Sequence, residues 1–362
     1  MRIDRIRITD FRNIASLELA LCPGANVIYG DNGQGKTNFI EAVWMCTGAK
    51  SFRGAKDAEL IRENAGYAVA EGETQGFGKE SRIRVFVGGQ PGARKARTVR
   101  VNGVDYGRAA NAAGTFTAVV FDPGHLSLVK GSPEGRRRFL DAALCQLYPG
   151  YVTLLRRYSR LVTQKNALLK SYWQTPDANG LLDVFDEKLA ESGAAVSAKR
   201  QEYLALIEPE ITGTYRDIAS GSETLAIQYE PSFEPEKGLA PVLRESRARD
   251  IAAGFCTAGP HREDFSISID GRAAKVFASQ GQQRSAVLSL KLAEAAGAQK
   301  ITGEHPVMLL DDVLSELDET RQSYLLSRME HRQTIVTACD PDLFRRTSGR
   351  VYRMEGGILH AL

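Results

Sequence analysis

The sequence predicts an α/β protein with a mixed or parallel core sheet, an antiparallel β subdomain and an inserted helical lobe. Short apolar runs at residues 27–29 and 307–310 predict buried core strands, because apolar runs of this length bounded by loop signals are typical of strands covered on both faces. From residue 136 to about 218, leucine, alanine and charged residues dominate, which predicts helices. We therefore expect residues 1–135 and 255–362 to form the core lobe, with residues 136–254 inserted between them.

Composition narrows the classes of protein. At 362 residues the chain exceeds one average domain, and its hydrophobic content of 43% and charged content of 25% are ordinary for a globular protein. A net charge of +3 is too small to indicate a nucleic-acid partner by itself. The five cysteines form no C-x-x-C pair, which argues against a disulfide framework or a zinc site. Since neither a signal peptide nor an apolar run of ~20 residues is present, we expect a cytoplasmic protein without a membrane partner.

The N-terminal residues 3–20 alternate in the manner of two strands joined by a turn at residues 10–13. Arg12 and Asn13 in this turn are close in sequence to the glycine-rich stretch that follows. They are candidates for contact with a bound nucleotide, and the alternative is an ordinary polar hairpin tip.

A phosphate-binding loop follows the first core strand. It fits G-x-x-x-x-G-K-[ST] at every position, with the residues Gly30, Asp31, Asn32, Gly33, Gln34, Gly35, Lys36 and Thr37. Apolar residues at helical spacing from 39 to 44 predict a helix directly behind it, so that consecutive N–H groups and the helix dipole would face phosphate oxygens. Lys36 would reach the β- and γ-phosphates, and the Thr37 hydroxyl would bind Mg²⁺. We therefore predict a site for a nucleoside triphosphate, with ATP and Mg²⁺ as the cofactors.

Basic residues gather after this helix. A short loop carries Arg53 and Lys56, and residues 79–101 form a predicted hairpin in which arginines alternate with aliphatic residues. The candidates for contact with DNA phosphates are Arg53, Lys56, Arg82, Arg84, Arg94, Lys95 and Arg97. The alternative is a solvated charged face.

The inserted lobe is predicted to contain a hairpin of helices. One helix runs through residues 154–162, another spans about 181–207, and residues 174–180 form the turn between them. This hairpin is too short for a long coiled-coil arm. A charged helix at 238–253 and a strand at 265–269 follow.

The second half of the predicted site lies near the C-terminus. Ser279 and Gly281 stand where a long helix begins, which makes a second anion site. The apolar strand at 307–310 ends in Asp311, a predicted Mg²⁺ ligand, and Asp312, which would orient or deprotonate the attacking water. Asp312 can reach the γ-phosphate only where strand pairing lapses, because adjacent strand residues point to opposite faces. Thr337 ends the next apolar strand and is predicted to face the ligand.

Together these motifs resemble the ABC-type ATPase head of the SMC class, and in detail the RecF family of bacterial recombination mediators. The matching segments are F-R-N at 11–13, the phosphate loop at 30–37, L-V-K-G-S-P at 128–133, R-R-R-F-L-D at 136–141, G-P-H-R at 259–262, S-Q-G-Q at 279–282 and L-D-D-V-L-S-E-L-D at 310–318. The resemblance covers nearly the whole length.

The resemblance implies a site shared between two chains. In ABC-type heads the signature of one subunit completes the nucleotide site of the other, so Ser279, Gly281 and Gln282 would contact the γ-phosphate held by a partner, and Asp318 would lie at the dimer seam. ATP would then join two chains head to tail. RecF-like proteins bind single-stranded DNA and single-strand/duplex junctions, and help RecO and RecR load RecA in gap repair, replication restart and SOS induction. The resemblance also implies a nucleoid-associated location.

Two departures from the ABC pattern imply slow hydrolysis, and we expect a weak, DNA-stimulated ATPase that acts as an ATP-gated dimerisation switch. Asp312 stands where transporters have glutamate, and Thr337 stands where a histidine is common. Three other functions remain open: a transporter nucleotide-binding subunit, an SMC-type structural protein, and an ATP-gated clamp that does not hydrolyse ATP. The basic hairpin and the helical lobe disfavour the first, and the short helical hairpin disfavours the second.

Overall fold

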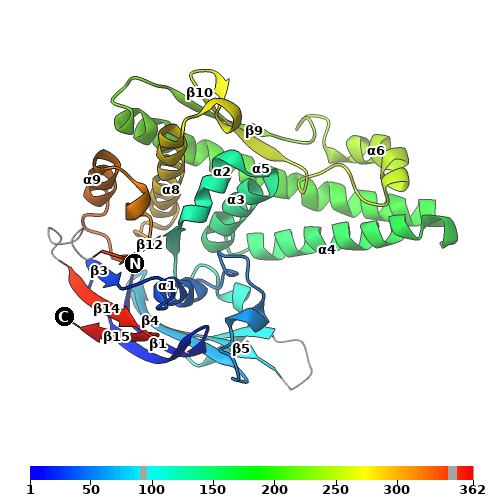
Figure 1. Ribbon diagram of the computed structural model, residues 1–362. Coiled ribbons are helices and arrows are strands. Elements are labelled where there is room, and N and C mark those ends of the chain that lie inside the picture. The colour runs from blue at the N-terminus through cyan, green and yellow to red at the C-terminus, as the bar shows by residue number, and fades with distance from the viewer. Residues whose placement is uncertain (90–95, 341–348, 362) are drawn as a thin grey trace.

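The computed structural model describes residues 1–89, 96–340 and 349–361, in which the strands form three sheets (Figure 1). The first sheet is antiparallel, with the order β2–β1–β4–β5–β6–β7: β1 Arg2–Phe11, β2 Ile14–Ala20, β4 Ala68–Gly76, β5 Lys79–Gly88, β6 Ala96–Val101 and β7 Val104–Arg108. The second is mixed, with the order β15–β14–β3–β13–β12–β8: β3 Ala25–Tyr29, β8 Ala118–Phe121, β12 Val307–Asp311, β13 Thr334–Ala338, β14 Arg350–Glu355 and β15 Ile358–Ala361. The third has the order β11–β10–β9: β9 Leu225–Glu230, β10 Asp264–Ile269 and β11 Arg272–Ala273.

Helices cover these sheets. The α-helices of the described residues are α1 Lys36–Met45, α2 Ser127–Lys130, α3 Pro133–Leu147, α4 Tyr151–Lys170, α5 Ala178–Ile218, α6 Leu239–Ala253, α7 Ala274–Phe277, α8 Gln280–Thr302 and α9 Glu319–Ser327. Short 3-10 helices are η1 Asp57–Leu60, η2 Ala109–Ala112, η3 Pro123–Leu126, η4 Tyr172–Gln174 and η5 Leu314–Glu316. None of the helices in the described ranges is long and apolar enough to span a membrane.

The mixed sheet separates two hydrophobic cores. Strands β14, β3, β13, β12 and β8 are parallel neighbours, and their side chains alternate between the two sides. Leu309 faces the core that contains α1 and the antiparallel sheet, whereas Leu310 faces the core that contains α3, α5 and α8. Burial on both faces explains why β3, β13, β12 and β8 are mainly apolar runs in the sequence. The predicted α/β class, with a mixed core sheet, is confirmed.

Helix α1 lies between the two large sheets, and it contacts β12 and β13 on one side and β1 and β4 on the other (Figure 1). The antiparallel sheet turns its apolar side towards α1. In β5, Ile83 and Val85 are buried, whereas Arg82 and Arg84 are exposed on the outer face. The alternation predicted for this strand is therefore confirmed.

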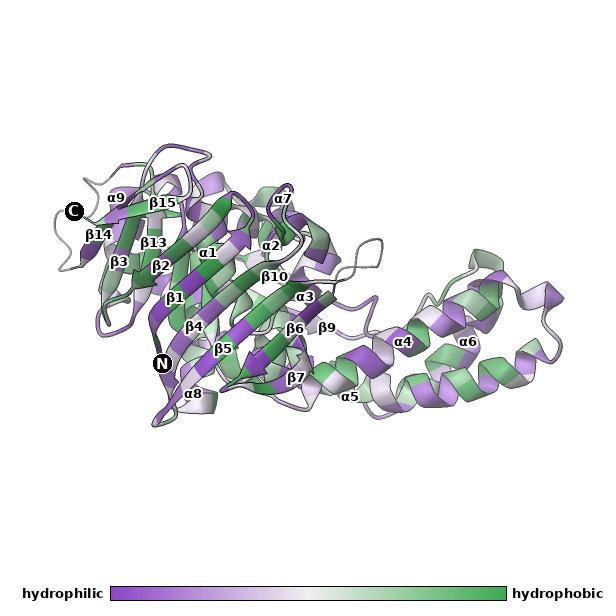
Figure 2. Cartoon of the chain, turned by 90° about the horizontal axis from the view of Figure 1, so that it is seen from below, coloured by the Kyte–Doolittle hydropathy of each residue, from purple (hydrophilic) through white to green (hydrophobic). Residues whose placement is uncertain are grey.

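The helical lobe projects from the body, with α4 and α5 side by side and α6 beside them (Figure 2). The predicted turn is present, because η4 and the N-cap Asp177 separate α4 from α5. The second helix is longer than expected and contains Pro209. Tertiary packing explains the difference: Ile211 and Tyr215 are fully buried, and this part of α5 packs along α8. The boundaries 136–254 of the inserted lobe remain a proposal. Strand β9 lies inside this range but pairs with β10, which lies outside it.

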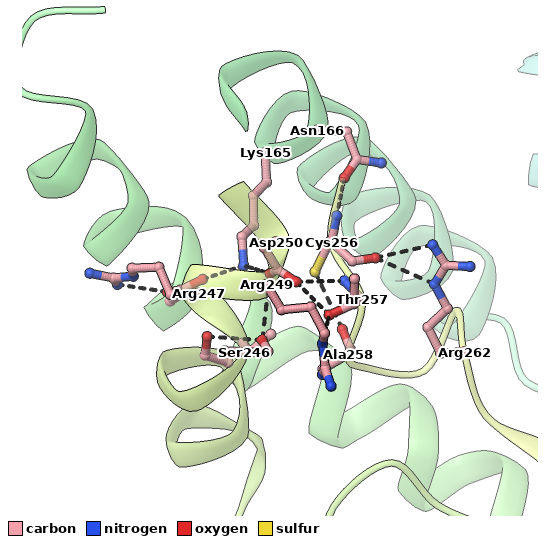
Figure 3. A network of polar contacts seen from close by, with 12 residues as sticks. Lys165, Asn166, Ser246, Arg247, Arg249, Asp250, Cys256, Thr257, Ala258 and Arg262 are labelled. Atoms are coloured by element: carbon pink, nitrogen blue, oxygen red, sulfur yellow. Dashed lines mark hydrogen bonds and ion pairs between the residues drawn. The ribbon is translucent and has the colours of Figure 1, made fainter. Parts of the chain in front are cut away.

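A buried ionic cluster joins helices α4, α5 and α6 of the lobe (Figure 3). The ammonium of Lys165 on α4 lies 2.8 Å from Asp186 on α5 and 3.0 Å from Asp250 on α6. Lys165 and Asp250 are 0% exposed, so the charges have no access to solvent. Arg247 extends the cluster by donating to Asp186 at 2.7 Å. Thr257 donates through its N–H and hydroxyl to Asp250, which ties the following loop to the lobe.

Lys165→Met should therefore destabilise the protein strongly. Removal of one member of a buried ion pair leaves uncompensated charge, here on two carboxylates, and costs about 3–5 kcal/mol. The measurement is the free energy of unfolding in urea. Lys170→Met, on the exposed side of the same helix, is the matched control and should change it by less than ~0.5 kcal/mol. Equal effects of the two substitutions would contradict the importance of the cluster.

Candidate active site

The phosphate loop connects β3 to α1, and its glycines adopt backbone conformations that other residues avoid. Gly30 has φ 152° and Gly35 has φ 114°. A Cβ atom on Gly30 would lie 2.3 Å from the carbonyl oxygen of Met354, and one on Gly35 would lie 2.8 Å from Oδ1 of Asn13. Only glycine satisfies both the backbone conformation and the space at these positions. The loop predicted from the sequence therefore needs glycine at these two positions, both for its backbone conformation and because neighbouring atoms lie close.

Lys36 begins α1, and the residue is 6% exposed. Its ammonium donates hydrogen bonds to the carbonyl oxygens of Gly30, at 2.6 Å, and Asp31, at 2.9 Å. The cation thus lies folded over the loop. A bound phosphate would compete with these two carbonyl oxygens for the N–H donors of Lys36. The ammonium would have to move only a short distance, because it already lies over the loop.

Asp311, at the end of β12, is the buried acid of the site. Two hydroxyls donate to its Oδ1: that of Thr37 at 2.9 Å and that of Thr337 at 2.8 Å. Burial raises the pKa of Asp311 above its ordinary value and outweighs the two hydroxyls, which lower it; the charges of Asp122 and Asp312 raise it further. A buried carboxylate beside a hydroxyl is the oxygen donor set that Mg²⁺ prefers. The pair Thr37 and Asp311 therefore fits the predicted metal.

Asp312 lies just beyond the strand and has φ 53°, a left-handed conformation. Its N–H is directed to β13, where it donates to the carbonyl oxygen of Thr337 at 3.2 Å and to its hydroxyl at 3.0 Å. Strand pairing thus ends at Asp311, as expected, and the turn changes the direction in which Asp312 points. Its role as the water-orienting acid stays a prediction.

Thr337 is 0% exposed, and its hydroxyl donates to Asp311 and accepts from the N–H of Asp312. It therefore contacts both acids, and its position facing the ligand stays a prediction. Cys339, two residues further on and exposed, was not identified from the sequence. Its sulfur lies 3.7 Å from the ammonium of Lys36 and 3.2 Å from Oδ1 of Asn32. The position of Cys339 directly after a predicted core strand is the sequence feature that could have identified it as part of the site.

The hairpin tip at Arg12 and Asn13 braces the phosphate loop. Arg12 has φ 55°, and its guanidinium donates to both carboxylate oxygens of Glu41 on α1, at 3.0 and 3.2 Å. Glu41 is 0% exposed, so Arg12 neutralises a buried charge. Asn13 donates to the carbonyl oxygen of Gly33 at 3.3 Å. Both residues thus contact the loop or its helix, whereas direct contact with a nucleotide stays a prediction.

The signature segment is a capped and exposed helix start. The hydroxyl oxygen of Ser279 accepts from the N–H of Gln282 at 3.2 Å, and Oε1 of Gln282 accepts from the N–H of Ser279 at 2.8 Å. This is a capping box at the N-terminus of α8. Gln282 also donates to Glu223 at 2.9 Å. Asp318 caps α9, because its Oδ1 accepts from the N–H of Arg321 at 2.9 Å.

Six of the seven predicted DNA contacts divide into three groups. On the outer face of β5, Arg82 donates to Glu73 at 2.7 Å and Arg84 lies 3.8 Å from Glu71, so carboxylates balance these arginines. Arg53 and Lys56 are exposed. Arg94 and Lys95 lie outside the described residues.

Arg97 differs from the other candidates. Its guanidinium is turned inward and donates to the carbonyl oxygen of Ala49 at 2.6 Å. Burial lowers its pKa from the ordinary value. Only 10% of its side chain is exposed, so the structure argues against the predicted contact of Arg97 with DNA.

A phosphate loop behind a parallel strand, a buried acid two strands away and a capped signature helix define an ABC-type ATPase head of the SMC class. The family model described as "RecF/RecN/SMC N terminal domain" matches residues 2–357. The chain belongs to the RecF family.

Relatives and solved structures support this assignment over the full length. The chain is 37% identical to the "DNA replication and repair protein RecF" of Halalkalibacterium halodurans, over 99% of both chains. It is 39% identical to the RecF protein of Agathobacter rectalis, over 95% of this chain and 94% of that one. A solved structure described as "recombination mediator protein RecF-ATPrS in RecFOR pathway" is 33% identical, with a TM-score of 0.91 over 100% of this chain and 98% of the other. An SMC head at 16% identity and a TM-score of 0.56 shares the fold.

Asp311→Asn should stabilise the protein in the absence of ligands. The amide oxygen can still accept from Thr37 and Thr337, while a buried negative charge is removed; the expected gain is about 0.5–2 kcal/mol, the range of single stabilising substitutions. The gain should be largest above the pKa of Asp311 and shrink as the pH falls, because protonation neutralises the native carboxyl. Thermal unfolding with a chelator present measures it. Asp105→Asn, at an exposed carboxylate, is the control, and a lower midpoint for Asp311→Asn would refute the argument.

Proposed function

We propose that this protein binds Mg²⁺–ATP, forms a head-to-tail dimer around it and hydrolyses it slowly, as a mediator of recombinational gap repair. The observation that carries the proposal is the hydrogen-bonded set of Thr37, Asp311 and Thr337 beside Lys36, which assembles the phosphate loop and the acid strand into one site. The ATP-bound structures of RecF relatives support the choice of nucleotide.

The chain's own residues account for binding and for the positioning of water. Loop N–H groups and Lys36 bind the phosphates, and Thr37 and Asp311 would hold the metal ion, which would neutralise charge that develops on the phosphates. Asp312 orients the attacking water from the turn after β12. Its side chain is shorter than a glutamate, so the acid reaches less far into the site. Turnover is therefore slow, and DNA raises it by favouring the joined state.

The second half of the site comes from another copy of the chain. Ser279 is exposed at the start of α8, and its hydroxyl oxygen accepts a hydrogen bond within the capping box while its proton is left to donate. An exposed helix N-terminus with a serine suits the γ-phosphate of a nucleotide held by a second chain. Ser279, Gly281, Gln282 and Asp318 are assigned to this trans contact.

Membership of the family supports the proposed biological role. Its members are described as DNA replication and repair proteins, and the solved relative is placed in the RecFOR pathway. We infer that the dimer binds single-stranded DNA and single-strand/duplex junctions, contacts RecR, and through RecO helps to load RecA during replication restart and SOS induction. This work takes place at the nucleoid in the cytoplasm.

Turnover as a function of protein concentration tests the shared site. Activity per chain should rise with concentration and with gapped DNA, because each site needs two chains. A mixing experiment is sharper: Lys36→Ala and Ser279→Arg chains should each be inactive alone and regain activity together, since a mixed dimer has one complete site. Activity per chain that is independent of concentration, together with no recovery on mixing, would leave a self-contained ATPase.

Asp312→Asn separates an enzyme from an ATP-gated clamp. If Asp312 prepares the water, turnover should fall at least about hundredfold, the usual contribution of a positioned acid or base, while the ATP-bound dimer accumulates. Phosphate release and light scattering measure the two effects, with Asp105→Asn as the control. If turnover is the same in the variant and the parent, Asp312 is not the acid and the clamp is the better description.

Charge reversal distinguishes the candidate DNA surfaces. Lys56→Glu should weaken DNA binding and reduce the slope of log K against log salt by about one contact, because Lys56 is exposed. Arg82→Glu should have a smaller effect, since Glu73 already neutralises Arg82. Lys237→Glu, on the helical lobe, serves as the control. A larger effect at Arg82 would instead place the DNA on the outer face of the antiparallel sheet.

A further inference from the structure

Arg321 on α9 bridges two segments that the proposed dimer would use together. Its Nε donates to the hydroxyl of Ser285 on α8 at 2.8 Å, and its NH1 forms an ion pair with Asp318. A Cβ atom on Gly281 would lie 3.3 Å from its NH2 group. Gly281 and Ser285 are four residues apart and share one face of α8. One guanidinium therefore contacts the Asp318 carboxylate and packs along the first turns of the signature helix.

The segment between the acids and α9 is short and held at several points. Ser315 donates to the carbonyl oxygen of Asp312 at 2.7 Å, and Gln322 donates to the carbonyl oxygens of Leu314 and Leu317 at 2.8 and 2.9 Å. These bonds fix the loop internally and to α9. The attachment of this loop to α8 depends on other contacts.

Arginine side chains supply that attachment. Arg284 on α8 donates to Glu316 at 2.6 Å, but the two side chains are 34% and 42% exposed, so this pair contributes little. Arg321 is 22% exposed, and its partner Ser285 is buried. The bond from Arg321 to Ser285 is thus the better shielded of these two links between the loop region and the signature helix.

We propose that Arg321 is a positioning residue for the shared nucleotide site, which it serves by holding the Asp318 loop and the start of α8 as one unit. The inference depends on the head-to-tail dimer proposed above, and it adds a residue that acts on the nucleotide of the partner. In the dimer, Ser279, Gly281 and Asp318 approach the same γ-phosphate, so their relative positions decide whether the site closes. A misplacement of about 1 Å in such a site costs roughly a hundredfold in rate.

Arg321→Ala should therefore separate binding from turnover. Binding of Mg²⁺–ATP to the dilute, monomeric chain should stay within about twofold, because Lys36, Thr37 and Asp311 are untouched. Turnover should fall by about tenfold to a hundredfold. Arg321→Lys should recover only part of the loss, since one ammonium cannot replace the planar fork that reaches Ser285 and Asp318. Arg328→Ala is the matched control and should leave turnover unchanged, because this exposed arginine lies directly after the same helix and bonds Tyr324 and Asp217 instead of the signature helix.

Mixing shows in which site Arg321 acts. Arg321→Ala chains mixed with an equal amount of Lys36→Ala chains should recover about a quarter of the parent activity, because half of the dimers are mixed and each has one complete site. Without recovery in this mixture, while Lys36→Ala and Ser279→Arg chains do recover, Arg321 acts within its own chain and the inference is wrong. No recovery in either mixture overturns the shared site itself, and the inference with it.

A second variant is needed if Arg321→Ala lowers the unfolding midpoint, because a loss of turnover in that variant could then reflect loss of folding. Ser285→Ala removes one partner of the bridge from a buried position, where the smaller side chain fits. It should lower turnover in the same direction as Arg321→Ala, with ATP binding unchanged and recovery on mixing with Lys36→Ala chains. Normal turnover in Ser285→Ala would overturn the proposal, because the bridge to α8 would then be without effect.

Discussion

The carboxylate of Asp311 is the group on which the geometry of the site depends. It is buried at the end of β12 and accepts hydrogen bonds from hydroxyls on two other elements, Thr37 at the start of α1 and Thr337 on β13. The parallel register of the sheet makes this possible, since Asp311 pairs with Thr337 and Thr337 pairs with Ile28 of β3. The carboxyl ends of three strands thus meet at one edge, where the phosphate loop begins. A buried acid under these hydroxyls is costly without a cation, and this cost favours the metal that the proposed reaction needs.

The surroundings of α1 keep this edge in place. The helix is covered on both sides, by the mixed sheet and by the antiparallel sheet, so the residues that follow the phosphate loop have little freedom. Glu41 within this layer is neutralised by Arg12 from the first hairpin, and Asn13 from the same hairpin contacts the loop backbone. The antiparallel sheet therefore supports the loop mechanically. Its outer face, where arginines and glutamates are paired, is less basic than the sequence of β5 indicates.

The helical lobe is connected to the signature rather than to the phosphate loop. The C-terminal part of α5 packs along α8, and α8 begins at the exposed Ser279. The lobe's own helices are fixed by the buried cluster around Lys165, whose partners lie on α5 and α6. The lobe is therefore held rigid and is joined to α8. A partner that bound the lobe would be connected through α8 to the surface that a second chain would contact.

The sequence by itself determined the features that depend on local backbone geometry and on periodicity. These include the phosphate loop, because Gly30 and Gly35 are required where the backbone is left-handed and crowded, and the start of α8, because a serine with a glutamine three residues later forms its own cap. The alternation in β5 likewise identified its buried face. Only the tertiary structure decided what each polar side chain contacts. Thr337 binds the acids, Arg97 turns inward and Arg321 bridges two helices, because their partners come from segments far away in the chain, and no local pattern records those distances.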